Sequence, residues 1–131
     1  QYWELRFEDP LSDAETLIFD DKGYITELGK KPGGFDRIKG QYTGLIKVRA
    51  DKIKEFVSFY KTLDRQKIYD AQDFLNMYMT SFIQELINSS WKVKGAFVKN
   101  GWLEVDSVED LEIYEQLSKA GKLDSFCQLE D

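Results

Sequence analysis

Two acidic residues near the end of the chain have the types and spacing of a Mg²⁺ site. Glu104 and Asp106 are separated by one residue in the stretch 102–107, just before a helical pattern begins. Side chains two positions apart project from the same face of a strand, so both carboxylates would face one way. Mg²⁺ prefers oxygen ligands and usually takes one or two carboxylates together with substrate phosphates. An alternative interpretation explains the same spacing without a metal. Glu104 would simply face solvent, and the negative charge of Asp106 would interact favourably with the dipole at a helix N-terminus.

A basic, glycine-rich loop is the second feature that could do chemistry. Residues 29–34 read Gly-Lys-Lys-Pro-Gly-Gly and lie in a block, residues 22–54, that carries nine bases and three acids. The preceding residues 1–21 carry seven acids and one base, so the change of charge is abrupt. Glycines let the backbone approach a ligand closely, and lysines attract phosphate. Lys31 is therefore a candidate phosphate contact, with a solvated loop lysine as the alternative.

The overall composition excludes several classes of site and partner. The chain has 131 residues, no histidine and one cysteine, Cys127, which rules out histidine-based nucleophilic sites, histidine zinc peptidases and cysteine-rich zinc sites within it. A pI near 4.8 argues against nucleic-acid binding. Because no apolar run approaches the ~20 residues that span a bilayer, we expect no membrane partner. The single cysteine favours a reducing compartment, and we expect a cytoplasmic location.

The elements that must position these residues alternate between strands and helices. Aromatic and β-branched runs predict strands over 2–7, 15–19, 24–28, 40–49, 91–98 and 102–105. Asp20 to Gly23 and Asn100-Gly101 predict hairpin turns. Apolar spacing predicts helices over 53–63, 74–87 and 108–120, the last capped by Ser107 and ended by Gly121. The chain is thus expected to be an α/β protein with one domain.

Five motifs occur along the chain in an order that resembles a known enzyme family. Residues 8–15, 25–32, 38–45, 79–82 and 102–107 together are similar to the carboxyl-terminal half of an NTP-transferase family nucleotidyltransferase. Within that family the chain most resembles phosphonate and phosphocholine cytidylyltransferases, as associated with phosphoenolpyruvate mutases. The Trp-x-Glu-x-Asp run is the most specific of the five. The implied fold is a three-layer mixed sheet with flanking helices, part of a nucleotide-diphospho-sugar transferase (glycosyltransferase-A-like) fold.

The resemblance implies a reaction and a role for each candidate residue. An NTP, expected to be CTP, is attacked at its α-phosphorus by an oxygen of a phosphonate, alcohol phosphate or sugar phosphate, and pyrophosphate leaves. Asp106 is expected to bind Mg²⁺, with Glu104 beside it in substrate binding. The family's Lys-Pro contact falls on Lys31, which is assigned to acceptor binding and catalysis. Gln41 and Tyr42 match the strand that lines the acceptor pocket. An anionic acceptor oxygen needs no general base, which is compatible with the lack of histidine.

The family's Gly-rich, NTP-binding segment has no match in residues 1–131, so we interpret them as a single incomplete domain, the acceptor-binding half of a nucleotidyltransferase. Such a half is expected to be inactive alone and to leave a sheet edge exposed, through which two copies could form a homodimer. Two other interpretations remain open. The chain could be a non-catalytic α/β binding or dimerisation module, or a half that pairs with a separate chain carrying the NTP loop.

Overall fold

The computed structural model describes residues 14–98, 101–125 and 127 and divides the chain into two compact units. One unit comprises Leu11–Gly95, and we call it the hairpin unit. The other comprises Gln1–Pro10 together with Ala96–Asp131, and we call it the C-terminal unit. The expectation of a single domain over residues 1–131 stays a prediction.

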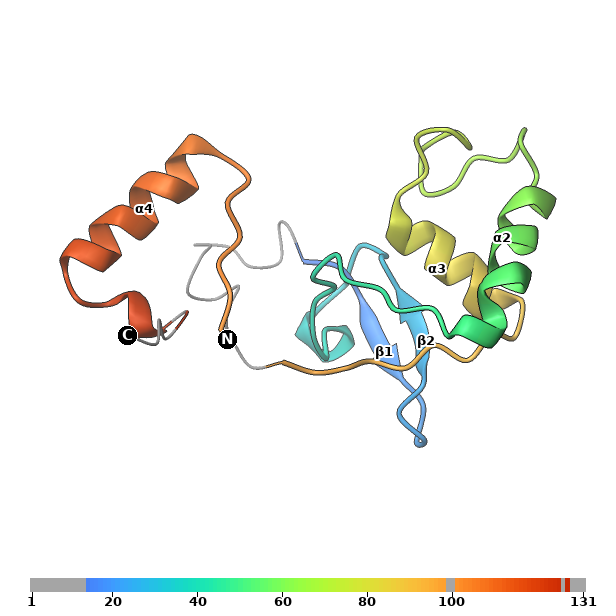
Figure 1. The fold of residues 1–131 in the computed structure, drawn as a ribbon, viewed down its shortest axis with the longest axis horizontal. Helices are drawn as coiled ribbons and strands as arrows, with labels where there is room; N and C mark the ends of the chain where they lie inside the picture. The colour runs from blue at the N-terminus through green and yellow to red at the C-terminus, as the bar shows by residue number, and fades with distance from the viewer. Residues whose placement is uncertain (1–13, 99–100, 126, 128–131) are drawn as a thin grey trace. The chain divides into compact units, whose positions relative to one another are not determined.

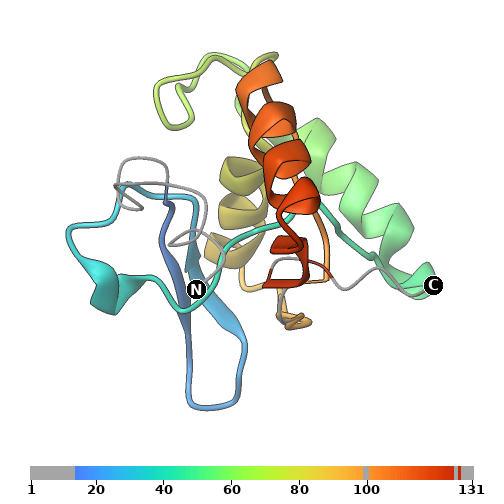
Figure 2. The ribbon, with the colours of Figure 1, turned by 90° about the vertical axis from the view of Figure 1, so that its left-hand side faces the viewer.

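The hairpin unit contains two antiparallel strands, β1 (Leu17–Phe19) and β2 (Ile25–Leu28). The Asp20 carboxylate closes the turn between them by accepting a hydrogen bond from the Tyr24 amide at 2.8 Å. Gly23 has a φ of 79°, which glycine adopts at little cost. The predicted strands over 15–19 and 24–28 and the hairpin turn between them are confirmed. Figures 1 and 2 both show the turn end of this hairpin extending beyond the two helices of the unit.

Two helices of the hairpin unit, α2 (Ile53–Thr62) and α3 (Met79–Asn88), lie side by side (Figure 1). The α3 helix packs on β2 and buries its apolar face there. The α2 helix has no fully buried residue and is held mainly by ring contacts, such as the edge-on contact of Phe56 with Phe82 at 5.2 Å between ring centres. The buried apolar cluster of the hairpin consists of Leu17, Ile25, Leu28 and Ile83.

Two short 3₁₀ helices, Phe35–Arg37 and Ala50–Lys52, complete the hairpin unit. The first follows the basic loop, and the second leads directly into α2. Within the described ranges, no helix is long and apolar enough to cross a membrane.

The C-terminal unit is built around α4 (Val108–Lys119), which is followed by a 3₁₀ helix, Leu123–Ser125. The Ser107 and Asp110 side chains form a reciprocal capping box at the start of α4. Tyr114 is buried on α4, and the partly buried side chains that pack on it are Trp102, Leu103, Leu117 and Leu123. The predicted helix and its serine cap are confirmed, and Gly121, with a φ of 64°, follows its end as expected.

The α/β composition is confirmed, but the described part of the chain has a smaller sheet than predicted. The strand predictions for 40–49, 91–98 and 102–105 are wrong: these segments form no strand in the described residues, apart from an isolated bridge between Tyr24 and Lys94. Gly44 has a φ of 81°, which breaks the extended backbone of 40–49, and Leu45 is 86 % exposed. The β-type composition of these three segments does not by itself form a strand, because a strand also needs a continuous partner strand with which to exchange backbone hydrogen bonds. The predicted strand 2–7 and the Asn100 turn lie outside the described residues.

The second predicted helix begins later than its apolar stripe. The stripe starts at Phe74, whereas α3 starts at Met79. The Asp73 carboxylate accepts hydrogen bonds from the backbone amides of Leu75 and Asn76 at 3.0 and 2.9 Å, which holds this segment in a turn. Phe74 is still buried, because it packs against the Tyr60 ring of α2 rather than against a helical neighbour.

Candidate functional site

The start of the basic loop is fixed to the beginning of β1 by Thr16, which is only 1 % exposed. The Thr16 amide donates to the Lys30 carbonyl at 2.8 Å, and the Lys30 amide donates to Thr16 Oγ1 at 3.1 Å. The Gly29 amide donates to the Thr16 carbonyl. Gly29 has a φ of 78°, and a Cβ there would lie 2.6 Å from Thr80 Cβ. The loop therefore leaves β2 in close contact with the first turn of α3.

The Lys30 side chain, 42 % exposed, forms an ion pair with Asp70. Asp70 lies in a two-residue turn in which the backbones of Tyr69 and Gln72 exchange hydrogen bonds of 2.7 and 2.9 Å. Asp70 and Ala71 have φ angles of 48° and 67°, a left-handed conformation that costs non-glycine residues free energy. Partial burial raises the pKa of the Asp70 carboxyl. The Lys30 ammonium and the Ser81 hydroxyl lower this pKa by a larger amount, so the net pKa is below its usual value.

A second ion pair lies at the end of β2. Both Glu27 carboxylate oxygens accept hydrogen bonds from Arg37 Nη2, at 2.8 and 2.7 Å. These hydrogen bonds, with a smaller contribution from Lys30, lower the pKa of the Glu27 carboxyl against the opposing effect of burial. Glu27 and Asp70 thus remain anionic at neutral pH and neutralise two of the cations in and around the basic loop.

Three of the predicted site residues lie in the hairpin unit. Lys31 is exposed in the loop, and no ion pair to it is seen within the described residues. The Gln41 amide is used by the chain's own backbone: Nε2 donates to the Glu15 carbonyl at 2.9 Å, and Oε1 accepts from the Glu15 amide at 3.1 Å. Tyr42 packs on the apolar cluster, and burial raises the pKa of its hydroxyl. Lys31 is therefore the best placed of the three to meet a ligand.

The predicted acidic pair lies in the C-terminal unit. Asp106 is exposed directly before α4, and its backbone amide donates to Asp110 Oδ2 at 3.1 Å. Glu104 is half-buried. Within the described ranges, no three Asp, Glu or Cys side chains gather in a metal cluster. Two carboxylate groups still fit Mg²⁺, because this ion completes its shell with water and substrate phosphates.

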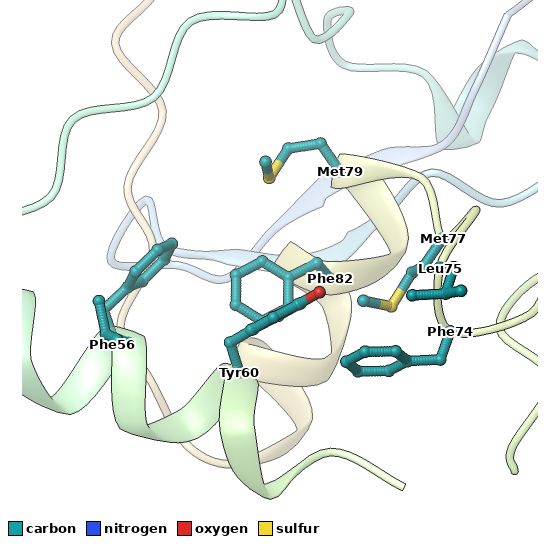
Figure 3. A pocket seen from close by; sticks show the side chains of 8 residues that line it. Phe56, Tyr60, Phe74, Leu75, Met77, Met79 and Phe82 are labelled. Carbon is teal, nitrogen blue, oxygen red and sulfur yellow. The ribbon is translucent and has the colours of Figure 1, made fainter. Parts of the chain in front are cut away.

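An apolar hollow of about 300 Å³ lies between α2 and the segment that leads into α3 (Figure 3). Its lining contains no charged side chain, so it offers apolar contact and no acid, base or metal ligand. The residues that line it are Phe56, Val57, Tyr60, Phe74, Leu75, Met77, Met79 and Phe82.

Comparison with known proteins gives a match over most of the chain. A CTP:phosphoglutamine cytidylyltransferase of Campylobacter jejuni is 46 % identical over 111 residues, which is 85 % of this chain. The chain is homologous to part of a cytidylyltransferase. The resemblance to cytidylyltransferases that the five motifs indicated is thereby confirmed. The chain spans 44 % of the relative's length. No family model and no solved structure matches the chain.

Sequence reasoning gave no role to Glu27, Lys30, Arg37 and Asp70, the four charged residues that the structure brings together in two ion pairs. Glu27 and Lys30 lie within the motif 25–32, so their position in a conspicuous segment was a usable signal. Asp70 carried no such signal, because its turn lacks the Asn-Gly or Asp-Gly sequence typical of left-handed two-residue turns. Only the fold brings Asp70 to Lys30 across 40 residues of sequence.

Proposed function

We propose that this chain takes part in cytidylyl transfer from CTP to a small phosphorylated acceptor. An anionic acceptor oxygen attacks the α-phosphorus of CTP, a new oxygen–phosphorus bond forms, and the bond to pyrophosphate breaks. The observation that carries the proposal is the 46 % identity with a relative whose name states both CTP and phosphoglutamine. Phosphoglutamine is therefore the first acceptor to test, and phosphonates, alcohol phosphates and sugar phosphates are the alternatives.

We propose that the chain supplies the acceptor side of the reaction. Its basic loop is fixed at Gly29 and Lys30 by Thr16, while the Lys31 side chain extends into solvent. A cation on a fixed backbone can hold an acceptor phosphate and offset the charge that would otherwise repel the triphosphate. We assign this role to Lys31, and we assign Gln41 and Tyr42 to the lining of the acceptor pocket. The relative is more than twice as long as the matched region, and we assign CTP recognition to protein outside that region.

No general base is needed in this mechanism, because the acceptor oxygen is already anionic at neutral pH. Catalysis would come from positioning and from neutralising the negative charge of two phosphorylated reactants. This agrees with a chain that has no histidine.

We propose that Asp106 binds Mg²⁺, with Glu104 beside it contacting the substrate. The support is chemical: both side chains are carboxylates, and Asp106 is exposed in front of α4. Bound Mg²⁺ would neutralise phosphate charge. The Asp106 amide is held by the Asp110 carboxylate, which fixes the backbone from which the Asp106 side chain extends.

The test is an assay of pyrophosphate release with CTP, Mg²⁺ and a panel of acceptors that begins with phosphoglutamine. It uses the longest natural polypeptide that carries this chain, with residues 1–131 alone in parallel. We expect Asp106→Asn to lower kcat/KM by about 10²-fold or more. Asp21→Asn, which removes the same charge from an exposed turn, is the matched control.

Lys31→Ala separates acceptor binding from the metal role. We expect it to raise KM for the acceptor about tenfold, because a charge-assisted contact is lost. Lys54→Ala, on the exposed side of α2, is its control. Turnover unaffected by Asp106→Asn would remove Asp106 from the site. Absence of turnover with any NTP, in a folded full-length protein, would refute cytidylyl transfer and favour a non-catalytic binding module.

A further inference from the structure

Ser81 carries a buried hydroxyl that makes no hydrogen bond in the described structure. The residue is 2 % exposed and lies in the first turn of α3. Burial raises the pKa of the Asp70 carboxyl, while the Lys30 ammonium and the Ser81 hydroxyl lower it to a net value below the usual one. Buried hydroxyl groups are normally paired, so an unpaired one points to a missing partner.

The same place is favourable for an anion. The α3 helix has ten residues, and Tyr78 at its N-cap makes no side-chain capping bond to the first turn. The amides at a helix N-terminus have no intrahelical partner and attract negative charge. Gly29 brings the backbone of the basic loop against Thr80, so the backbone of Lys30 is held close to this turn.

A carboxylate of the chain itself already pairs with this lysine. Asp70 forms an ion pair with Lys30, and its side chain is 29 % exposed, so solvent and small solutes reach it. It is held there by two consecutive left-handed residues, Asp70 and Ala71. Displacement of the carboxylate would let this strained turn relax, which lowers the cost of exchanging it for another anion.

We propose that Lys30, Ser81 and the first turn of α3 form an oxyanion-binding subsite in which the Asp70 carboxylate is a stand-in for a carboxylate or phosphate group of the acceptor. The inference rests on the proposed function only for the identity of the ligand, since the subsite itself is defined by the hairpin unit. A small acceptor that carries a second anionic group besides its reacting phosphate would place that group here.

Anion binding to the ¹⁵N-labelled chain, followed by amide chemical shifts, tests this subsite directly. The probes are inorganic phosphate and acetate in separate titrations, which distinguish the two sources of the oxyanion. We expect saturable shifts at the amides of Gly29, Lys30 and Ser81 with at least one probe. The probe that binds more tightly identifies the group that the subsite takes. No saturable shift at these amides with either probe would overturn the proposal.

Variants at the stand-in and at its lysine give opposite expected effects. Asp70→Asn should bind the probe about threefold more tightly, because a competing exposed ion pair is removed. Lys30→Gln should bind about tenfold more weakly. The controls Asp21→Asn and Lys54→Gln make the same charge changes on exposed residues elsewhere. They should leave the affinity for the probe within about 1.5-fold of the unmodified chain, because salt screens distant exposed charges.

A second variant guards against misfolding of the first. Asp70→Gly also removes the carboxylate, and glycine accepts the left-handed backbone at this position, so the same tightening is expected. Unchanged or weaker binding in both Asp70 variants, with dispersed spectra, would refute the role of Asp70. These titrations need neither CTP nor turnover. Anion binding without transferase activity would therefore refute the proposed function alone, and activity without anion binding would refute the subsite alone.

Discussion

The close approach of Gly29 to α3 predicts a large and specific loss of stability when a methyl group is added. In Gly29→Ala the new Cβ would lie 2.6 Å from Thr80 Cβ and 2.8 Å from Thr80 Oγ1. The backbone φ of 78° adds a conformational penalty of about 1 kcal/mol for alanine. Overpacking of this kind costs about 2 kcal/mol more. We therefore expect the free energy of unfolding to fall by about 3 kcal/mol.

The chain offers a matched control that separates the two contributions. Gly23 has nearly the same φ, 79°, but a Cβ there would meet no atom within 4 Å. Gly23→Ala should therefore lose only the conformational part, about 1 kcal/mol. The difference between the two variants, about 2 kcal/mol, measures the clash with Thr80. A double-mutant cycle with Thr80→Gly, which removes the contacted atoms, should return a coupling energy of similar size.

Urea unfolding followed by tryptophan fluorescence provides the measurement. Trp91 reports on the hairpin unit, because its ring lies 6.3 Å from that of Phe56 on α2. With a slope of about 1–2 kcal/mol per molar urea, the midpoints of the two alanine variants should differ by about 1–2 M. Equal losses in Gly29→Ala and Gly23→Ala, or a coupling energy near zero, would refute the packing of the basic loop on α3 and the placement of Lys30 that depends on it.

Three further predictions follow from other contacts. Gln84→Met should lower the free energy of unfolding by about 2 kcal/mol, because Gln84 Oε1 accepts a buried hydrogen bond from the Leu28 amide at 2.8 Å. Urea unfolding measures this loss, and Gln66→Met, on an exposed turn, is the control that should show little change. Since Arg37 lowers the pKa of Glu27, the pair stabilises the fold above the ordinary value of 4.5, and this contribution is lost as pH falls through the lowered pKa. In Arg37→Ala, a carboxyl NMR titration should show the Glu27 pKa rising, and an unchanged value would contradict the ion pair. Ser107→Ala removes the cap of α4 and should cost about 1 kcal/mol of helix stability, which faster amide exchange confined to α4 would report.

The features predicted correctly from sequence are those set by local chemistry. Asp20 and Gly23 specify the hairpin turn through a side-chain acceptor and a left-handed glycine. Ser107 and Asp110 specify the start of α4 through a capping box whose two members are three positions apart. In each case the groups that decide the conformation lie within one turn of each other, so composition and spacing suffice.

The features that sequence reasoning missed depend on partners distant in the chain. Residues 40–49 have the composition of a strand, but a strand needs a continuous neighbour. Here the side chain of Gln41, rather than its backbone, forms the hydrogen bonds to the backbone of Glu15. Phe74 has helical spacing, but Asp73 turns the backbone and Tyr60 supplies the packing partner. The spacing of apolar residues predicts which of them will be buried, but it does not identify the element against which they will pack.

The candidate site shows the same division between local and distant information. Two adjacent lysines, Lys30 and Lys31, are equivalent in the sequence, and only Lys31 was assigned a role. In the fold they differ, because Asp70 reaches Lys30 from 40 residues away and neutralises it. With Arg37 also paired to Glu27, the excess positive charge of residues 22–54 overstates what a ligand would meet at the loop. Attraction of a phosphorylated acceptor would therefore begin with Lys31, and the second cation would become available only when an incoming anion replaces the Asp70 carboxylate.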